Sequence, residues 1–268
     1  NRVWMHHFGR GISRTPNDFG KLGEAPTHPE LLDWLASEFV ARGARLKDLH
    51  RLIVTSATYR QSSAPRDDAL ATDPVNDLFS RAPIRRLTAE GVRDSILAVG
   101  GRLNLEMGGP GIYPEMPRAV LETSSRPDAA WGRSSPEQAA RRSIYVHVKR
   151  SLVMPLLQAF DLADADTSCP VRFVTTLPTQ ALTMLNSDFL NQQAAILRDR
   201  VVAERDSLEQ RLARGLELVT QRPARDEEVE ALSRLHAELG TEHGCDADEA
   251  LRLCCLTLLN LNEFVYVD

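Results

Sequence analysis

The chain has 268 residues, of which 43% are hydrophobic and 26% are charged, and its formal net charge is −5. This length and composition predict an ordinary globular protein with a sizeable core, in one large domain or two small ones. Its Lys and Arg residues are scattered rather than striped, which argues against nucleic acid as the main partner. No stretch approaches the roughly 20 apolar residues of a membrane span, and no signal peptide is recognisable.

The N-terminal part carries two strong helix patterns. In the stretch THPELLDWLASEFVARG, Thr27 is predicted to be the N-cap, and Glu30 completes a capping box three residues later. Pro29 lies in the first turn and Gly43 follows the last one. A second helix is expected over residues 46–57. Because the connection is short, the two helices are predicted to form an antiparallel or angled hairpin.

The middle of the chain changes character. Thr88 is predicted to cap a helix that Gly100 and Gly101 end. Residues 107–138 hold five prolines and four glycines, which break regular structure. Large apolar residues such as Trp131 are interspersed among them, so we expect an ordered, irregular segment packed on the helices rather than a flexible linker.

The C-terminal half is predicted to open with one strand and to continue in helices. In residues 141–150, RRSIYVHVKR, apolar residues from Ile144 to Val148 alternate with polar ones, which is typical of a strand. Pro178 opens a helical pattern that runs to about Glu204. Three further helices are expected, over residues 207–220, 226–239 and 246–262.

Together these patterns predict a mainly α fold, a helical bundle with an irregular Pro/Gly-rich excursion and at most a small β element. We expect residues 1–268 to form a single domain. Its parts are a helical region over 1–106, an irregular segment over 107–140, and a strand plus C-terminal helical bundle over 141–268. The first residues already have a helical pattern without an initiator Met before them. We therefore expect the chain to be a fragment of a longer protein.

The cysteines predict no bound cofactor. Cys169, Cys245, Cys254 and Cys255 form neither a C-x-x-C pair nor the C-x-x-C-H motif that attaches c-type haem. Cys254 and Cys255 lie in an apolar helical run and are interpreted as buried hydrophobic residues. A disulfide between Cys169 and Cys245 is left open.

An aspartate-rich loop, FDLADADTSC, crowds Asp161, Asp164 and Asp166 just after an apolar run. These carboxylates need a cation or N–H donors, since a helix C-terminus already carries partial negative charge. They could supply three oxygen ligands to Ca²⁺, but the glycine and the terminal glutamate of an EF-hand are missing. We expect instead that Arg172 binds Asp161 or Asp164 and that other carboxylates accept backbone N–H groups, so no metal is expected.

Two adjacent histidines stand in the stretch WMHHFGRG. Neighbouring residues on a helix point about 100° apart, so one metal could not easily bind both His6 and His7. We expect one ring to be packed and the other exposed, unless Asp18, His28 or His50 converges on the pair. The candidate polar cluster comprises six residues: His6, His7, Asp18, Asp161, Asp164 and Arg172.

Other catalytic patterns are weaker. Glycoside hydrolysis needs two carboxyl groups roughly 5 to 9 Å apart. Such a pair could be drawn from four residues, namely Asp18, Glu24, Asp161 and Asp164. The sequence GGPG at residues 108–111 lacks the following Lys-Ser/Thr of a phosphate-binding loop and is interpreted as a turn.

Eight phrases occur in the order of one known family. They are NRVWMHHFGRGI, TPNDFGKLGEAPTHPELLDWLASEF, DLHRLIVTSATYRQSS, RRLTAEGVRDSIL, RRSIY, FDLADADTSCPVR, LPTQALTMLNSDF and LLNLNEFVYVD. Together they resemble the planctomycete-type secreted domain of unknown function that follows a planctomycete-type cytochrome c domain and a second uncharacterised domain. The resemblance spans the chain from end to end. In the aspartate loop, Ala163 replaces a proline of many relatives, and four positions match them: Asp161, Asp164, Ser168 and Arg172.

The resemblance implies an extracytoplasmic location, periplasmic or secreted, and c-type haem in an upstream domain outside this chain. It also implies other domains of the same polypeptide as partners, with a redox partner or a polysaccharide as further candidates.

Two functions stay open. One is a scaffold or docking module of a secreted, cytochrome c-linked multidomain protein. The other is an extracytoplasmic enzyme of polysaccharide breakdown or associated redox chemistry. Convergence of the candidate residues on one pocket favours the enzyme, and dispersal favours the scaffold.

Overall fold

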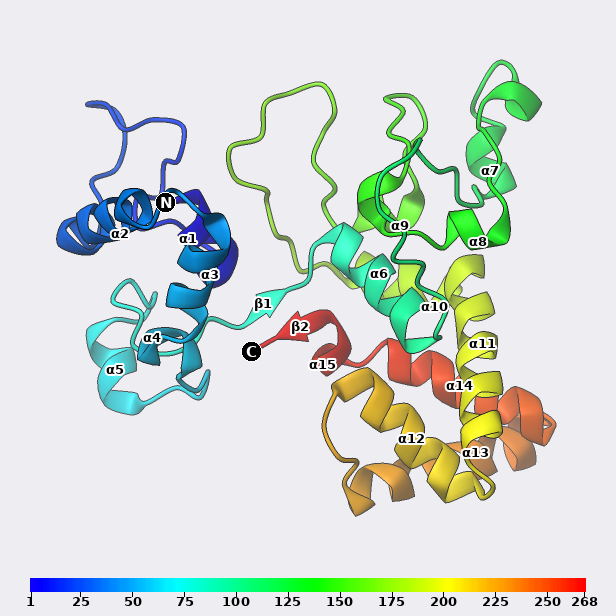
Figure 1. Ribbon diagram of the computed structural model, residues 1–268. Coiled ribbons are helices and arrows are strands. Elements are labelled where there is room, and N and C mark those ends of the chain that lie inside the picture. Colours follow the sequence, from blue (N-terminus) through cyan, green and yellow to red (C-terminus); the bar gives the residue numbers. More distant parts are fainter. The chain divides into compact units, whose positions relative to one another are not determined.

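The computed structural model describes residues 1–268 and confirms the mainly α fold (Figure 1). It contains fifteen α-helices and one two-stranded sheet, in which β1 (Arg85–Arg86) pairs with β2 (Tyr266–Val267). None of the helices combines the length and the apolar character that crossing a membrane requires.

The chain forms two compact units. The first unit comprises Asn1–Arg85, Cys169–Val171 and Tyr266–Asp268. The second unit comprises Arg86–Ser168 and Arg172–Val265.

The first unit is built around an aromatic core. Its helices are α1 (Arg2–Phe8), α2 (Pro29–Ala41), α3 (Leu46–Val54), α4 (Ala57–Arg60) and α5 (Asp67–Thr72). Trp4 stacks on Phe8 with the ring centroids 4.1 Å apart, and Phe79 meets Trp4 edge-on at 5.2 Å. Such offset and edge-on contacts are the preferred geometries of aromatic pairs. The core therefore fixes α1 against the loop that carries Phe79.

The predicted capping box of α2 is wrong. His28 is the N-cap residue and its side chain makes no capping hydrogen bond. Thr27 instead donates its backbone N–H to the Ile12 carbonyl at 2.9 Å, and its hydroxyl donates to the same oxygen at 3.3 Å. The threonine ties α2 to the loop after α1, and this nonlocal contact takes the hydroxyl away from the cap. Pro29 opens the helix, as predicted.

The second unit contains the remaining helices. They are α6 (Ala89–Val99), α7 (Arg118–Leu121), α8 (Pro136–Ala139), α9 (Pro155–Ala159), α10 (Pro178–Asn186), α11 (Asp188–Glu204), α12 (Leu208–Thr220), α13 (Asp226–His243), α14 (Ala247–Leu259) and α15 (Asn262–Val265). Two short 3₁₀-helices lie at η1 (Pro127–Ala129) and η2 (Ser143–Tyr145).

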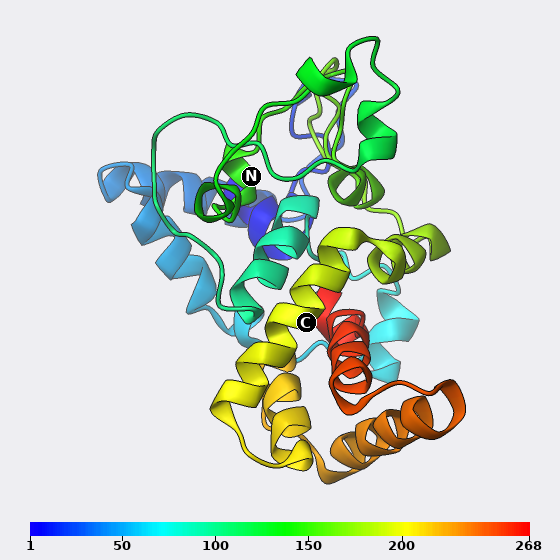
Figure 2. The same cartoon turned by 90° about the vertical axis from the view of Figure 1, so that its right-hand side faces the viewer.

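Helices α11 and α14 form the centre of the C-terminal bundle. Both views show the yellow α11 beside the red α14 (Figure 1, Figure 2). On α11, the side chains of Leu190, Ala194, Leu197 and Val201 are fully buried. Their spacing of three or four residues places them on one helix face, so the period of apolar residues in the sequence decides which side packs inward.

The long helical pattern from Pro178 to Glu204 is interrupted. Ser187 has φ −73° and ψ 127°, an extended conformation that separates α10 from α11. Asn191 Nδ2 donates to the carbonyls of Leu185 and Ser187 at 3.2 and 3.0 Å. The first bond satisfies a carbonyl in the last turn of α10, and the second joins the Asn191 N–H, which also donates to the Ser187 carbonyl at 3.0 Å.

The predicted strand over residues 141–150 is wrong. Residues Ser143–Tyr145 form η2, and the following residues make only isolated bridges. Ile144 and Val148 are 71% and 56% exposed, whereas Val146 is 8% exposed. The alternating apolar residues thus do not share one buried face, because the 3₁₀ turn rotates the chain between them.

The Pro/Gly-rich segment is ordered, and the buried Arg141 holds much of it. Arg141 Nε and Nη2 donate to the Glu106 carbonyl at 3.3 and 3.2 Å. Nη1 reaches the Pro110 carbonyl at 3.4 Å, and Nη2 also donates to the Gly108 carbonyl. The guanidinium lies 4.0 Å from the Tyr145 ring centroid. One arginine thereby satisfies several carbonyls that regular structure would otherwise have paired.

The four cysteines are free thiols. Cys254 and Cys255 are buried in α14, as predicted, and burial raises the pKa of Cys254 to about 11 and that of Cys255 to about 12. Both thiols are therefore un-ionised near neutral pH.

Candidate functional site

Asp161 lies at the centre of a polar network in the second unit. Its carboxylate accepts an ion-paired hydrogen bond from Arg86 Nη2 at 2.6 Å. The Thr175 N–H donates to it at 2.8 Å, and the Thr175 hydroxyl at 2.9 Å. Gln180 Nε2 binds the Thr175 carbonyl at 3.1 Å. Arg86 takes the place of the predicted partner Arg172.

The network keeps Asp161 ionised. Burial opposes ionisation, but the hydrogen bonds from Thr175 and the charge of Arg86 outweigh it, so that the pKa of Asp161 lies below its usual value. The Arg86 side chain is 2% exposed and stacks on Phe160, with 5.0 Å between guanidinium carbon and ring centroid. Both carboxylate oxygens thus have a protein donor, and the network holds the loop after α9.

The other charged residues in and just after the aspartate loop bind partners outside the Asp161 network. Arg172 Nη1 binds both carboxylate oxygens of Glu90, at 2.9 and 2.7 Å. Asp166 pairs with Arg150. Asp164 is exposed, and its Oδ1 accepts the Asp166 N–H at 2.9 Å in a local turn.

The two adjacent histidines separate as expected: His6 is exposed and His7 is partly buried. His7 Nε2 lies 2.8 Å from Nδ1 of His50 on α3, so one ring donates a hydrogen bond to the other. Tyr59 packs edge-on against His7 at 5.5 Å. Burial, together with the charges of His50 and Arg85, lowers the pKa of His7. The pair can share one proton.

Neither Asp18 nor His28 joins the histidine pair through a hydrogen bond. Asp18 is exposed and its carboxylate accepts the Gly20 N–H at 2.9 Å. His28 Nδ1 lies 2.9 Å from the Thr27 hydroxyl. No group of three or more His, Cys, Asp or Glu side chains is placed to hold a metal ion.

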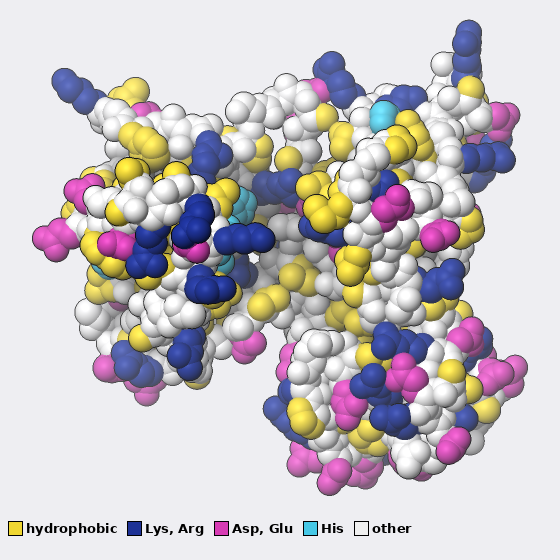
Figure 3. Space-filling view, viewed as in Figure 1, with side chains coloured by type: hydrophobic (Ala, Val, Ile, Leu, Met, Phe, Trp, Pro, Cys, Tyr) yellow, Lys and Arg dark blue, Asp and Glu magenta, His cyan; other side chains and the backbone are white.

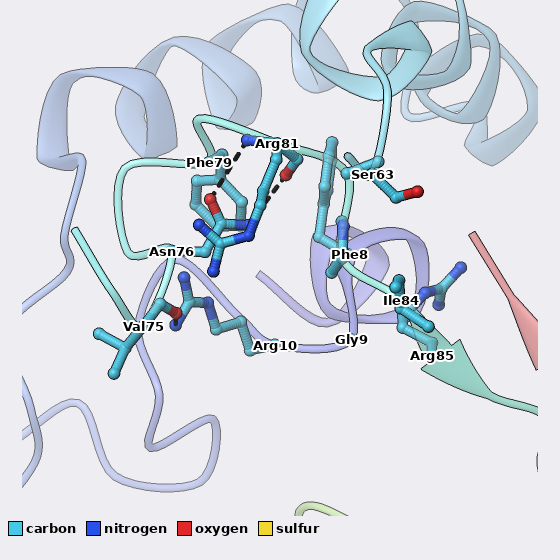
Figure 4. Close-up of a pocket in the computed structure, with 12 residues that line it drawn as sticks. Phe8, Gly9, Arg10, Ser63, Val75, Asn76, Phe79, Arg81, Ile84 and Arg85 are labelled. Atoms are coloured by element: carbon cyan, nitrogen blue, oxygen red, sulfur yellow. Dashed lines mark hydrogen bonds between the residues drawn. The ribbon is translucent and has the colours of Figure 1, made fainter. Parts of the chain in front are cut away.

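An arginine-lined pocket of about 450 Å³ opens in the first unit. Lys and Arg side chains gather on the face of this unit seen in Figure 3. Arg10, Arg81 and Arg85 line the pocket, and none of its lining residues is acidic. Figure 4 shows Arg10 and Arg81 beside Val75 and Asn76, with the other lining residues extending toward Ile84. A pocket of this volume is large enough for a small molecule.

A smaller pocket of about 130 Å³ lies in the second unit. Glu90 is its one acidic lining residue, and apolar side chains such as Leu152, Met154 and Leu157 form much of the wall. The volume is below the range typical of ligand sites.

The structure thus distributes the six candidate residues over separate contacts. His6, His7 and Asp18 belong to the first unit, and the others belong to the second. No pattern in the sequence indicated Arg86 or the arginine pocket. Arg85 and Arg86 are neighbours in β1, where successive side chains point to opposite faces. That rule could have indicated that Arg85 and Arg86 have different surroundings, but it could not have identified the residues that each one binds.

Comparison with known proteins gives a family for the chain. Residues 1–236 match the family described as PSD1, Protein of unknown function (DUF1553). The chain belongs to this family. No curated protein and no solved structure is significantly similar to it. Because the description of DUF1553 states no activity, the role of this DUF1553 chain has to be argued from its own residues.

Proposed function

We propose that this DUF1553 chain is a helical interaction module of a secreted, cytochrome c-linked multidomain protein. The observation that carries the proposal is a run of exposed, large apolar side chains between residues 173 and 185 of the second unit. The exposed fractions are 84% for Phe173, 64% for Val174, 52% for Leu177, 56% for Leu182 and 44% for Leu185.

These side chains are concentrated along one short stretch of chain. Phe173, Val174 and Leu177 precede α10, and Leu182 and Leu185 stand three residues apart on that helix, which places them on neighbouring positions of its surface. Exposed apolar residues scattered singly are normal, but a concentration of them is characteristic of a binding surface. We therefore assign segment 173–185 as the docking surface.

The nearby polar groups support binding rather than catalysis. Asp161, Thr175 and Gln180 bind one another or backbone carbonyls, and these bonds tie the exposed segment to the end of α9 and the loop after it. Neither pocket is lined by the two carboxylates that a glycoside hydrolase needs. What supports the proposal is thus an exposed apolar segment that hydrogen bonds hold in place.

The partner in this proposal is another part of the same secreted polypeptide, in which an upstream domain would carry c-type haem. This context rests on the resemblance of the eight sequence phrases. An apolar docking surface fits such a partner, because domains of one chain are held at high effective concentration and need only a modest interface.

The test compares binding of the separately produced upstream part to this chain and to its variants by titration calorimetry. Burying one large apolar side chain stabilises a complex by roughly 1.5–3 kcal/mol, so Phe173→Ser or Leu182→Ser should weaken binding by about tenfold or more. Met107→Ser is the control, since Met107 is 78% exposed in the same unit but outside the segment. Equal weakening by the control, or no binding by the unmodified chain, would contradict the proposal.

A further inference from the structure

Two arginines that line the pocket of the first unit have N–H groups that no protein acceptor satisfies. Arg10 uses Nη1 to bind the Val75 carbonyl at 3.0 Å and the Asp77 carboxylate at 2.6 Å, while its Nη2 is buried without a partner. Arg81 uses Nη2 to bind the Pro74 carbonyl at 3.0 Å, while its Nη1 is buried without a partner. A buried donor left without an acceptor is costly, so each of these groups calls for one.

The position of these groups distinguishes them from other unsatisfied arginine atoms. Arg86 and Arg93 also have buried nitrogens without an acceptor, but neither residue lines either of these two pockets. Arg10 and Arg81 both line the same 450 Å³ space. Both nitrogens are closed off from solvent in this conformation, so a small turn of each guanidinium toward the space would let one acceptor satisfy donors from both side chains.

The loop that presents Arg81 is fixed in advance. The Asp73 carboxylate accepts the N–H groups of Asp77 and Leu78, both at 2.7 Å. Asn76, in the left-handed region at φ 58°, donates from Nδ2 to the Arg81 carbonyl at 2.9 Å. A loop held by its own side chains loses little conformational entropy when a ligand binds.

Charge and shape indicate what the pocket would bind. Three guanidinium groups and no carboxylate line it, although Asp77 offsets part of the charge by pairing with Arg10. Guanidinium groups bind carboxylate, phosphate and sulfate oxygens through charge-assisted hydrogen bonds. The Phe8 and Phe79 rings and the Ile84 side chain supply an apolar wall.

We propose that this pocket binds the oxyanion group of a small molecule, with the unsatisfied N–H groups of Arg10 and Arg81 as its donors and the apolar wall against the rest of the ligand. Phosphate, sulfate and carboxylate share the required chemistry. This site lies in the first unit and is independent of the docking surface at residues 173–185, so each proposal can fail without the other.

Titration of the chain with inorganic phosphate, sulfate and benzoate, at constant ionic strength, tests the site and separates the three oxyanions. Ile84→Glu adds a carboxylate at a side chain that is 63% exposed and lines the pocket. We expect it to weaken binding of the preferred anion by about tenfold or more, since like charges repel. Ile84→Gln, of the same shape without the charge, should stay within about twofold of the unmodified chain.

A second pair of variants tests the donors. Arg81→Gln removes the charged guanidinium and should weaken binding of the preferred anion by about tenfold or more. Arg60→Gln removes an exposed arginine of the same unit that does not line the pocket, and should leave the affinity within about twofold. If none of the three anions binds the unmodified chain, or if Ile84→Glu binds as well as Ile84→Gln, the proposal is wrong and water satisfies these N–H groups.

Discussion

Arg141 of the second unit and the pocket arginines of the first unit use their N–H groups in opposite ways. In the second unit, Arg141 is 1% exposed, and its nitrogens donate to the carbonyls of Glu106, Gly108 and Pro110. In the first unit, Arg10 and Arg81 are partly exposed, and each keeps one buried N–H group without an acceptor at the edge of a pocket.

The number of arginines in a region therefore does not indicate what those arginines do. A guanidinium whose donors all reach backbone carbonyls acts as a structural brace for irregular chain. A guanidinium that keeps a donor free beside a pocket can bind a ligand. An unsatisfied N–H group on a residue that also lines a pocket, rather than the charge alone, separates the two roles.

The largest expected effect comes from removing the brace. Arg141→Met should lower the free energy of unfolding by about 3 kcal/mol or more, because the hydrogen bonds of a buried guanidinium to three backbone carbonyls are lost. Arg142→Met, at the exposed neighbouring position, should change it by less than about 0.5 kcal/mol. Urea denaturation measures both. Arg81→Met loses one backbone hydrogen bond, so its loss of free energy of unfolding should lie between those of the other two variants. An equal loss in Arg81→Met and Arg141→Met would contradict the contrast between the two arginines.

A smaller loss is expected at the centre of the second unit's polar network. Asp161→Asn keeps the shape and tolerates the positive φ of 62°, but it removes the charge that Arg86 pairs with. We expect a cost of about 1–3 kcal/mol from chemical denaturation. Asp164→Asn, in an exposed turn, serves as the control and should be nearly neutral.

The lowered pKa of Asp161 also predicts how stability changes in acid. Because the pKa of Asp161 is lowered in the folded state, its contribution to stability is present above its ordinary value of 3.8. It is lost as the pH falls through the lower folded value. In thermal melts between about pH 5 and about pH 2.5, the midpoint should fall less steeply with pH for Asp161→Asn than for the unmodified chain.

An intermediate effect distinguishes two helix starts. The Thr88 hydroxyl accepts the Gly91 N–H at 3.1 Å as the N-cap of α6, whereas Thr27 does not cap α2. Thr88→Ala should therefore cost about 1 kcal/mol. Thr27→Ala should cost less, since it removes a 3.3 Å hydrogen bond to Ile12. A larger loss at Thr27 than at Thr88 would show that the tie to Ile12 matters more than the cap.

The smallest effect should arise from the histidine pair of the first unit. The pKa of His7 is lowered in the folded state, so the unfolded chain binds the proton more readily below the ordinary value of 6.5. Stability should therefore fall as the pH drops from about 7 toward the folded pKa, a window well above that of Asp161. NMR titration of the imidazole measures the pKa of His7, and thermal melts of His7→Gln measure its effect on stability. If His7→Gln leaves the pH dependence of stability unchanged, His7 is not its source.

The sequence by itself determined the features that depend on neighbours along the chain. Thr88, Ser207 and Asp246 each accept an N–H three residues later, at the starts of α6, α12 and α14. The helical pattern from Pro178 to about Glu204 was also predicted, although Ser187 interrupts it. Helix caps and helical periodicity are set within a few residues, so they can be read before folding.

The tertiary structure alone decided which distant groups meet. Arg86 and Asp161 are 75 residues apart in the sequence, and His7 and His50 are 43 apart, so no local pattern could select these partners. The alternation at Ile144, Val146 and Val148 predicted a strand, yet no neighbouring strand pairs with it, and a 3₁₀ turn prevailed. A strand needs hydrogen-bonding partners from elsewhere in the chain, and an ion pair needs a chain path that brings its members together.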